Sequence, residues 1–396
     1  MAIKRPTILA PIPFFEPGYK AGGSVRTLSN LIRAMQGHYR FRIVCTDRDL
    51  GDSAPYAGVP GDRLISGEVY EAYYLTASPG ALRRLIMLVK TQDYELLYLN
   101  SVFSPLFTLL PLALRRLRII RRVPVVICPR GELSDAALTI KSYKKRPFLK
   151  LAAWFGLYRD AVWQSASPYE SEEIRRRIGP QAEVMLAPDF PSLAVPDRIA
   201  EEKRAGQLRL IFFSRIAPIK NLLFALNCVQ QLEGKATLDI YGPIEDASYW
   251  RLCQEAIDKL ANPALVAYRG ALAPHEVANT LTRYDLFVLP TLGEGYGHAI
   301  VEALTAGCPV LISDRTPWRG LADKGVGWEL SLSDEQRFVD VLSRCAAMDG
   351  KAHRAMKERA AAYGREIIHN DGTLQAHVAM FERACGIAAG REEQHG

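Results

Sequence analysis

The chain has 396 residues, of which 48% are hydrophobic and 23% are charged, and its formal net charge is +7. This composition is ordinary for a globular protein, and the length predicts two domains without repeats or low-complexity segments. The seven cysteines are scattered and include no CxxC pair, which indicates neither a disulfide framework nor a zinc site and fits a reducing cytosol. No run reaches the roughly 20 apolar residues of a membrane span. The short apolar run before Pro11 and Pro13 predicts a first strand rather than a signal peptide.

Strand and helix patterns alternate through the N-terminal half. This alternation predicts a parallel, doubly wound sheet with helices on both faces. The turn Gly22-Gly23-Ser24 stands just before a helix, where glycine lets the backbone approach a ligand closely. The predicted elements are strands at 7–13, 41–46, 96–100 and 124–128, and helices at 24–35, at 80–90 and after residue 105.

A loop at Arg130, Gly131 and Glu132 follows the strand that ends near Cys128. Open α/β sheets bind their ligands at this carboxyl edge, so the three residues are candidate ligand-binding residues. The alternative is that Arg130 only pairs with Glu132 or Asp135. A basic helix spanning 141–150 comes next, and a short charged helix at 169–178 closes the domain.

Prolines and a polar run predict a linker over 191–207, which separates an N-terminal domain at 1–190 from a second domain at 208–372. The second domain repeats the alternation, with Gly242 and Gly270 each ending a strand. After Trp328 the pattern turns helical. The predicted strands of this domain lie at 208–213, 237–241, 266–269, 285–290 and 309–313.

The stretch from Asp285 to Asp314 predicts a strand, a glycine-rich turn, a helix and a second strand. Gly293, Gly295 and Gly297 form the turn, and the helix N-terminus after it attracts phosphate or sugar oxygens. Glu294 lies in the turn and Glu302 about one helical turn further on. Both carboxylates suit paired sugar hydroxyls, or else Glu294 is a solvated loop residue and Glu302 complements the helix dipole.

The segment Ser214 to Asn221 also follows an apolar strand and precedes a helix. Together with EGYGHAIVEALTAGCPVLISD, it resembles the retaining nucleotide-sugar glycosyltransferases of family 4. Their E-x7-E signature is matched by Glu294 and Glu302, and their preceding Arg and Lys by Arg215 and Lys220. Ser214 stands where glycine is usual. The resemblance implies a GT-B fold, in which two Rossmann-like doubly wound parallel-sheet domains face each other across a cleft.

The resemblance also implies roles for particular residues. Arg215 and Lys220 would stabilise the diphosphate leaving group without a metal, Glu294 would orient hydroxyls of the donor sugar, and Glu302 would bind the ribose. His298 would contact the donor or cap its helix. The loop Arg130 to Glu132 would lie on the acceptor side, and helix 373–396 would cross back to the first domain. The remaining donor-side residues would be Gly22, Gly23, Ser214, Gly242, Gly270, Gly295, Tyr296 and Gly297.

The function implied by the resemblance is retaining transfer of a sugar from a nucleotide-sugar, UDP- or GDP-linked, in bacterial surface polysaccharide synthesis. The acceptor would be a glycan or a lipid-linked glycan. No resident cofactor, metal or nucleic-acid partner is expected. Two alternatives stay open: a GT-B epimerase or hydrolase of nucleotide-sugars, and a non-enzymatic nucleotide-sugar-binding protein.

Positive charge is concentrated in the first half of the chain. Residues 1–195 hold 27 Lys and Arg against 17 Asp and Glu. Much of this charge falls on an apolar helix carrying Arg115 to Arg122 and on the segment 141–150. Such segments favour an anionic bilayer, which predicts a cytoplasmic enzyme on the inner face of the membrane. The alternative is an ordinary buried helix whose arginines reach solvent.

Overall fold

The computed structural model describes residues 5–139, 142–192, 194, 196, 203–232, 236–262, 265–370 and 372–392. These residues divide into two compact units, one within Met1–Phe190 and Asp371–Gly396 and the other within Pro191–Asn370. Residues 193, 195 and 197–202 of the predicted linker lie outside the described residues, as does Lys141 of the predicted basic helix.

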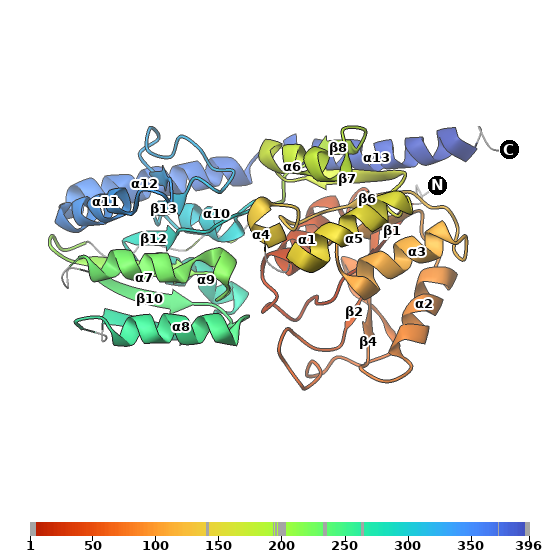
Figure 1. The fold of residues 1–396 in the computed structure, drawn as a ribbon, viewed down its shortest axis with the longest axis horizontal. Coiled ribbons are helices and arrows are strands. Elements are labelled where there is room, and N and C mark those ends of the chain that lie inside the picture. Colours follow the sequence, from red (N-terminus) through yellow and green to blue (C-terminus); the bar gives the residue numbers. More distant parts are fainter. Residues whose placement is uncertain are drawn as a thin grey trace. The chain divides into compact units, whose positions relative to one another are not determined.

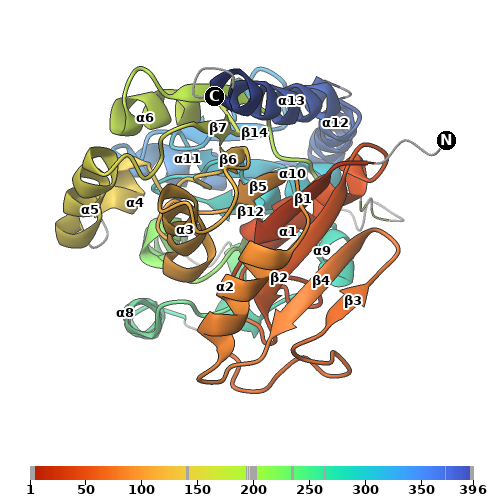
Figure 2. The ribbon, with the colours of Figure 1, turned by 90° about the vertical axis from the view of Figure 1, so that its right-hand side faces the viewer.

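The first unit is built on an eight-stranded sheet in the order β3-β4-β2-β1-β5-β6-β7-β8. Every neighbouring pair is parallel except β3 and β4, which form an antiparallel hairpin at one edge. Figure 2 shows β1, β2 and β4 side by side. The elements are β1 (Thr7–Pro11), α1 (Gly23–Met35), β2 (Arg40–Thr46), β3 (Leu64–Ser66), β4 (Tyr70–Leu75), α2 (Ala81–Thr91), β5 (Leu96–Leu99), the π-helical turn η1 (Pro105–Leu109), α3 (Leu110–Arg116), β6 (Val125–Ile127), α4 (Asp135–Thr139), α5 (Ser142–Trp154), β7 (Ala161–Ser165), α6 (Pro168–Ile178), β8 (Glu183–Leu186) and α13 (Gly372–Glu392).

Side chains of the first sheet alternate between two cores, as the period of a strand requires. Ile8 and Ala10 of β1 pack on one face with residues of α1 and with Phe381 of α13. Leu9 points to the other face, where α2, α3, α5 and α6 cover the sheet. Helices on both faces make this unit doubly wound, as the alternation predicts, and α13 joins it from the far end of the chain (Figure 1).

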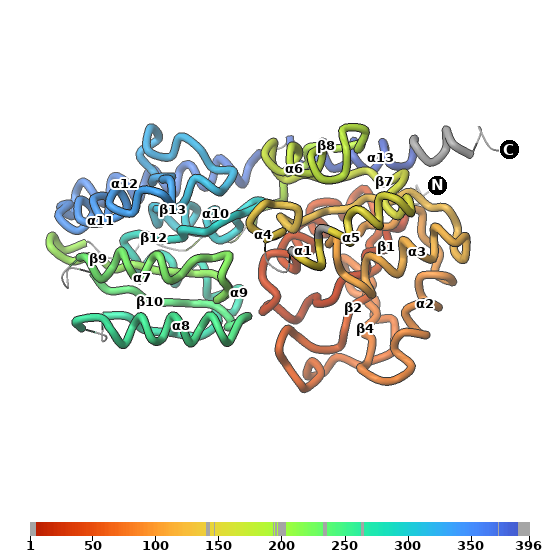
Figure 3. Tube along the Cα trace, viewed as in Figure 1, coloured from red at the N-terminus to blue at the C-terminus, as the bar shows by residue number. Residues whose placement is uncertain are grey.

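The second unit has a six-stranded parallel sheet in the order β11-β10-β9-β12-β13-β14, and Figure 3 follows its chain. From β9 the chain builds outward to β11, then returns to the other side of β9 and builds outward again. This is the doubly wound order of a Rossmann-like fold. The elements are β9 (Leu208–Phe213), the 3-10 turn η2 (Pro218–Lys220), α7 (Leu222–Gln230), β10 (Ala236–Tyr241), α8 (Ala247–Asp258), β11 (Val266–Gly270), α9 (Pro274–Leu281), β12 (Leu286–Leu289), α10 (His298–Thr305), β13 (Val310–Ser313), β14 (Gly327–Leu330), α11 (Glu335–Ala347) and α12 (Gly350–Ile368).

The elements named from the sequence agree with the structure to within a few residues, except at two places. The helix expected after residue 105 begins as the π-helical turn η1 and ends at Arg116, before the last arginines of that segment. The region after Trp328 is not helical from its start, because Trp328 itself lies in β14, which pairs with β13.

Candidate active site

The switch point of the second sheet lies between β9 and β12, where the chain leaves neighbouring strands in opposite directions. Parallel α/β sheets bind ligands in the crevice at such a point. The loop after β9 carries Ser214 and Arg215, and the loop after β12 carries the glycine-rich turn. Topology thus brings the two predicted donor-binding segments to one edge of one sheet.

Gly242 allows the loop after β10 to press against the loop after β9. Its φ is +138°, and a Cβ atom there would lie 1.9 Å from the carbonyl oxygen of Ser214. The Ser214 amide donates to Tyr241 O at 3.0 Å, and the Ile216 amide donates to Pro243 O at 2.9 Å. Gly242 is therefore needed for backbone packing that fixes the position of Ser214 and Arg215.

Two hydrogen bonds attach η2 to the glycine-rich loop. The Leu292 amide donates to Ile219 O at 2.8 Å, and the Thr291 hydroxyl donates to the same carbonyl at 3.0 Å. Lys220 follows directly, and its ammonium forms a hydrogen-bonded ion pair with the Glu294 carboxylate. The two side chains are only 10% and 17% exposed. Glu294 is therefore a paired group of the site and not a solvated loop residue.

The glycine-rich loop is anchored on its other side by residues after β13. The Glu294 amide donates to Arg315 O at 3.0 Å, and the Trp318 indole donates to Tyr296 O at 2.7 Å. Gly297 closes the loop in the left-handed region at φ +86° as the N-cap of α10. These contacts hold the loop against the positive end of the helix.

The other predicted residues of this unit lie around the same edge. Arg215 pairs with Glu245, which sequence reasoning did not single out, and both side chains are about one-third exposed. His298 is buried, begins α10 and packs on the Tyr296 ring at 5.0 Å, and the N-cap residue of this helix is Gly297, which has no side chain. Glu302 is half-buried within α10. Gly270 ends β11 at φ +81° and accepts from the Gly242 amide at 2.8 Å.

In the first unit, Gly22 is the N-cap of α1 and has a φ of +73°. The loop before it is fixed by Asp49, a buried residue whose carboxylate accepts from the Tyr19 and Lys20 amides at 2.7 and 2.9 Å. Gly23 begins the helix. The loop that carries Gly22 and Gly23 lies at the switch point of this sheet, between β1 and β5.

Arg130 belongs to a buried polar network of the first unit. Its guanidinium donates to Asp189 at 2.5 Å, to Asn100 at 2.6 Å and to the Tyr98 hydroxyl at 3.0 Å. The pairing with Glu132 or Asp135, considered as an alternative, is wrong, since Asp189 is the carboxylate that Arg130 contacts and Asp135 pairs with two arginines of α6.

Gly131 and Glu132 complete the anchoring of this loop. The Gly131 amide donates to Glu170 at 2.8 Å. The Glu132 carboxylate accepts from the Ser101 hydroxyl at 2.9 Å and from the Val102 amide at 2.6 Å. Burial raises the pKa of Glu132, and these hydrogen bonds oppose the rise. Hydrogen bonds of Arg130, Gly131 and Glu132 thus fix the conformation of the loop. Its role in binding the acceptor stays a prediction.

Two kinds of feature are absent from the part of the chain that the structure describes. No three His, Cys, Asp or Glu side chains converge there as metal ligands would. No described helix is both long and apolar enough to cross a bilayer.

Residues 207–347 match the family described as glycosyl transferases group 1, and residues 22–189 match the glycosyl transferase 4-like domain. These two ranges take in well over half of the chain. The protein belongs to the glycosyltransferases of the GT-B type, in the family 4-like group.

Among curated relatives, the chain is 28% identical over 194 residues to EpsF of Bacillus subtilis (strain 168), which carries a provisional name as a glycosyltransferase. It is 26% identical over 203 residues to the D-inositol 3-phosphate glycosyltransferase of Mycobacterium marinum (strain ATCC BAA-535 / M). The matches take in 47% and 50% of this chain. The chain spans about half of the length of these relatives, 50% and 43%.

Solved structures show the same fold at low identity. Sucrose-phosphate synthase from Thermosynechococcus elongatus superposes with a TM-score of 0.72 at 16% identity, covering 96% of this chain and 99% of that one. Anabaena HepE in complex with UDP-glucose gives 0.68 at 16% identity, covering 96% and 99%. WaaG, described as a glycosyltransferase involved in lipopolysaccharide biosynthesis, gives 0.67 at 13% identity, covering 94% and 98%.

Proposed function

We propose that this enzyme transfers a sugar, with retention of configuration and without a metal, from a nucleoside diphosphate sugar to a glycan or lipid-linked glycan. The observation that carries the proposal is the ion pair between Lys220 and Glu294 at the switch point of the second sheet. It joins a cation suited to a diphosphate with a carboxylate suited to sugar hydroxyls.

The chemistry follows from where charge develops. Breaking the bond between the sugar C1 and the diphosphate oxygen builds negative charge on the leaving group and positive charge on the ring. Arg215 and Lys220 would stabilise the leaving group. Glu294 keeps the Lys220 ammonium in place and would orient the donor sugar. Glu302 would bind the ribose hydroxyls.

Retention would arise because the acceptor hydroxyl attacks C1 from the same face from which the diphosphate leaves. A phosphate oxygen would take the proton of that hydroxyl. This route needs no pair of catalytic carboxylates of the hydrolase type. Solved relatives of the same fold hold UDP or UDP-glucose, which supports a UDP-linked donor. The lipopolysaccharide role given for WaaG supports a surface polysaccharide as the product, made on the cytoplasmic side of the membrane.

The experiment is a thermal-shift panel of UDP-, GDP- and ADP-sugars. A donor present at 100 times its Kd stabilises the protein by about 2.7 kcal/mol and raises its Tm. We expect one nucleotide to stand out and its free diphosphate to bind as well. A flat response to all three nucleotides at millimolar concentration would contradict the proposal.

A second measurement on the same samples, the release of nucleoside diphosphate, distinguishes a transferase from a protein that only binds the donor. Slow release of the nucleoside diphosphate without acceptor is expected of a transferase, whereas a binding protein leaves the donor intact. Conversion of the donor to an epimer, or release of free sugar that no acceptor suppresses, would instead support the epimerase or hydrolase alternative.

A further inference from the structure

Helix α5 presents an apolar stripe to solvent in addition to its buried face. Leu149 and Ala152 pack in the core of the first unit. Tyr143, Leu151 and Trp154 are spaced so that they lie on one side of the helix, away from this buried face. Their side chains are 71%, 54% and 78% exposed. Phe155 continues the stripe past the helix end at 60% exposure. Apolar side chains concentrated in this way mark an interaction surface.

A second segment adds apolar side chains to the stripe. Arg116, the last residue of α3, donates from Nε to the Phe155 carbonyl at 3.2 Å, so the ends of α3 and α5 are in contact. Leu117 and Ile119 follow Arg116 and are 69% and 44% exposed. We define the tip surface as Leu117, Ile119, Tyr143, Leu151, Trp154 and Phe155.

The two segments that carry the tip surface are basic. The segments 115–122 and 143–159 contain no Asp or Glu. Arg118, Arg122, Lys144, Lys150 and Arg159 are exposed beside the apolar side chains. The surface therefore attracts a partner that offers anionic groups and an apolar layer together.

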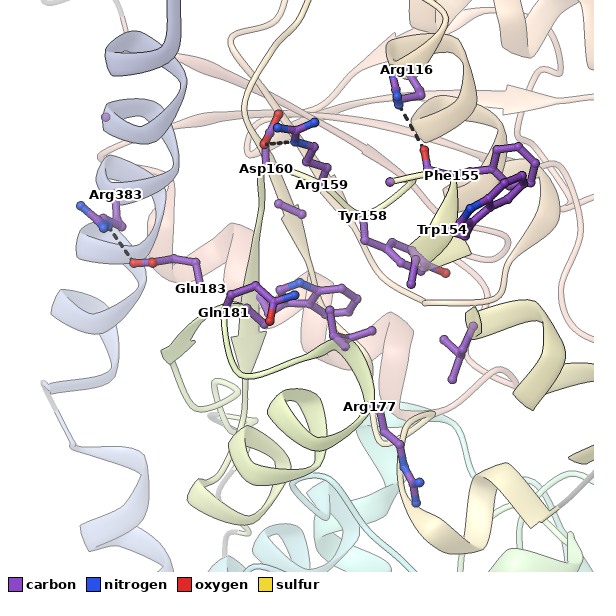
Figure 4. Close-up of a pocket in the computed structure, with 18 residues that line it drawn as sticks. Arg116, Trp154, Phe155, Tyr158, Arg159, Asp160, Arg177, Gln181, Glu183 and Arg383 are labelled. Atoms are coloured by element: carbon purple, nitrogen blue, oxygen red, sulfur yellow. Dashed lines mark hydrogen bonds and ion pairs between the residues drawn. The ribbon is translucent and has the colours of Figure 1, made fainter. Parts of the chain in front are cut away.

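A pocket of about 800 Å³ opens beside the aromatic end of the tip surface. Trp154 and Phe155, whose rings lie edge to face at 4.6 Å, line it together with Arg116 and Arg159 (Figure 4). Two carboxylates also line the pocket, and each pairs with an arginine there: Asp160 with Arg159 and Glu183 with Arg383. Guanidinium groups next to aromatic rings suit a phosphate head group whose chains continue into an apolar layer.

We propose that the tip surface docks this protein on an anionic phospholipid bilayer, with Trp154 and Phe155 entering the interface and the surrounding arginines and lysines contacting head groups. The two basic segments that the sequence suggests for membrane contact both contribute to this surface, whereas Phe107, Leu112 and Leu114 before the arginines of the first segment are buried in the core. A second copy of the chain is a poor partner, since like charges would face each other. Nucleic acid offers nothing for the aliphatic side chains Leu117, Ile119 and Leu151.

The test is co-sedimentation of the full chain with phosphatidylcholine vesicles, with and without phosphatidylglycerol, at low and high salt. We expect binding only with the anionic lipid, weakened by salt. Trp154→Ala with Phe155→Ala should lower the partition coefficient about tenfold or more. Arg118→Gln and Arg122→Gln should each lower it about fivefold. The matched controls Leu252→Ala and Lys351→Gln, exposed in the second unit, should leave it unchanged.

Three results would overturn the proposal: no binding to anionic vesicles, equal binding by the Trp154 and Phe155 variant, or binding to single-stranded RNA in place of vesicles. Self-association of the chain that the same variant abolishes, without vesicle binding, would assign the surface to a dimer instead. The assay contains no nucleotide-sugar, so its outcome is independent of the proposed transferase function.

Discussion

His377 makes the stability of the first unit depend on pH. This residue of α13 is 1% exposed. Its Nδ1 contacts the Thr373 carbonyl at 2.9 Å, and its Nε2 contacts the Gln164 side-chain Nε2 at 3.2 Å. A carbonyl only accepts and an amide nitrogen only donates, so the neutral ring with its proton on Nδ1 satisfies both contacts. A second proton on Nε2 would face a donor.

Burial accordingly lowers the pKa of His377 from 6.5 to about 4, against an opposing hydrogen bond to Thr373. Above pH 6.5 neither the folded nor the unfolded chain is protonated there, and the ring has no effect on the pH dependence. As the pH falls from 6.5 to 4, only the unfolded chain takes up the proton, so stability is lost. The loss is about 2 kcal/mol by pH 5 and about 3 kcal/mol below pH 4.

The assay is urea unfolding of the wild type and His377→Gln at pH 8, 6 and 5, with the exposed His38→Gln as the matched control. Glutamine can accept from Gln164 and donate to Thr373, and it does not titrate. The wild type and the control should lose about 2 kcal/mol more than His377→Gln between pH 8 and pH 5. Equal losses in all three proteins would refute the reasoning about the neutral ring.

Two substitutions separate binding roles from structural ones. Glu302→Ala should weaken binding of the nucleotide-sugar and of the free diphosphate in the thermal-shift panel, and unchanged affinity would reduce Glu302 to a helix-dipole residue. Arg130→Met should cost about 3–5 kcal/mol of stability in urea unfolding, because the buried Asp189 carboxylate loses the guanidinium that balances its charge and keeps only hydrogen bonds such as that from the Thr27 hydroxyl. Arg176→Met, which removes an exposed pair with Asp135, should cost less than about 1 kcal/mol. An Arg130→Met protein of normal stability that fails only in transfer would favour the acceptor role.

The fold could be predicted from the sequence because its strands are apolar runs that alternate with helical patterns. β9 shows this well, since its predicted and observed bounds are both 208–213. The short strands β3, β7 and β8 do not stand out from the neighbouring sequence as apolar runs, so the sequence does not predict them. The helix after residue 105 ends early because the backbone of Arg118 adopts the left-handed region, at φ +59°. Its apolar residues Phe107, Leu112 and Leu114 pack in the core, and periodicity cannot tell a core-facing stripe from a membrane-facing one.

The donor side of the site could be anticipated because its residues lie on two short segments with a recognisable spacing. Lys220 and Glu294 are 74 residues apart and still meet, since β9 and β12 are neighbours in the sheet. The partners of other residues carry no local signal. Glu245 for Arg215 and Asp189 for Arg130 lie on loops that only the folded chain brings close.

The central claim is that Arg215 and Lys220 stabilise the leaving group without a metal. Its most direct test is the rate of nucleoside diphosphate release from the donor that the thermal-shift panel selects, in the presence of EDTA, for the wild type, Arg215→Ala and Lys220→Ala. We predict that EDTA leaves the wild-type rate intact and that each variant loses roughly 10²–10³-fold in turnover while keeping its fold. Near-wild-type turnover in either variant, or a complete loss in EDTA that magnesium or manganese restores, would contradict the claim.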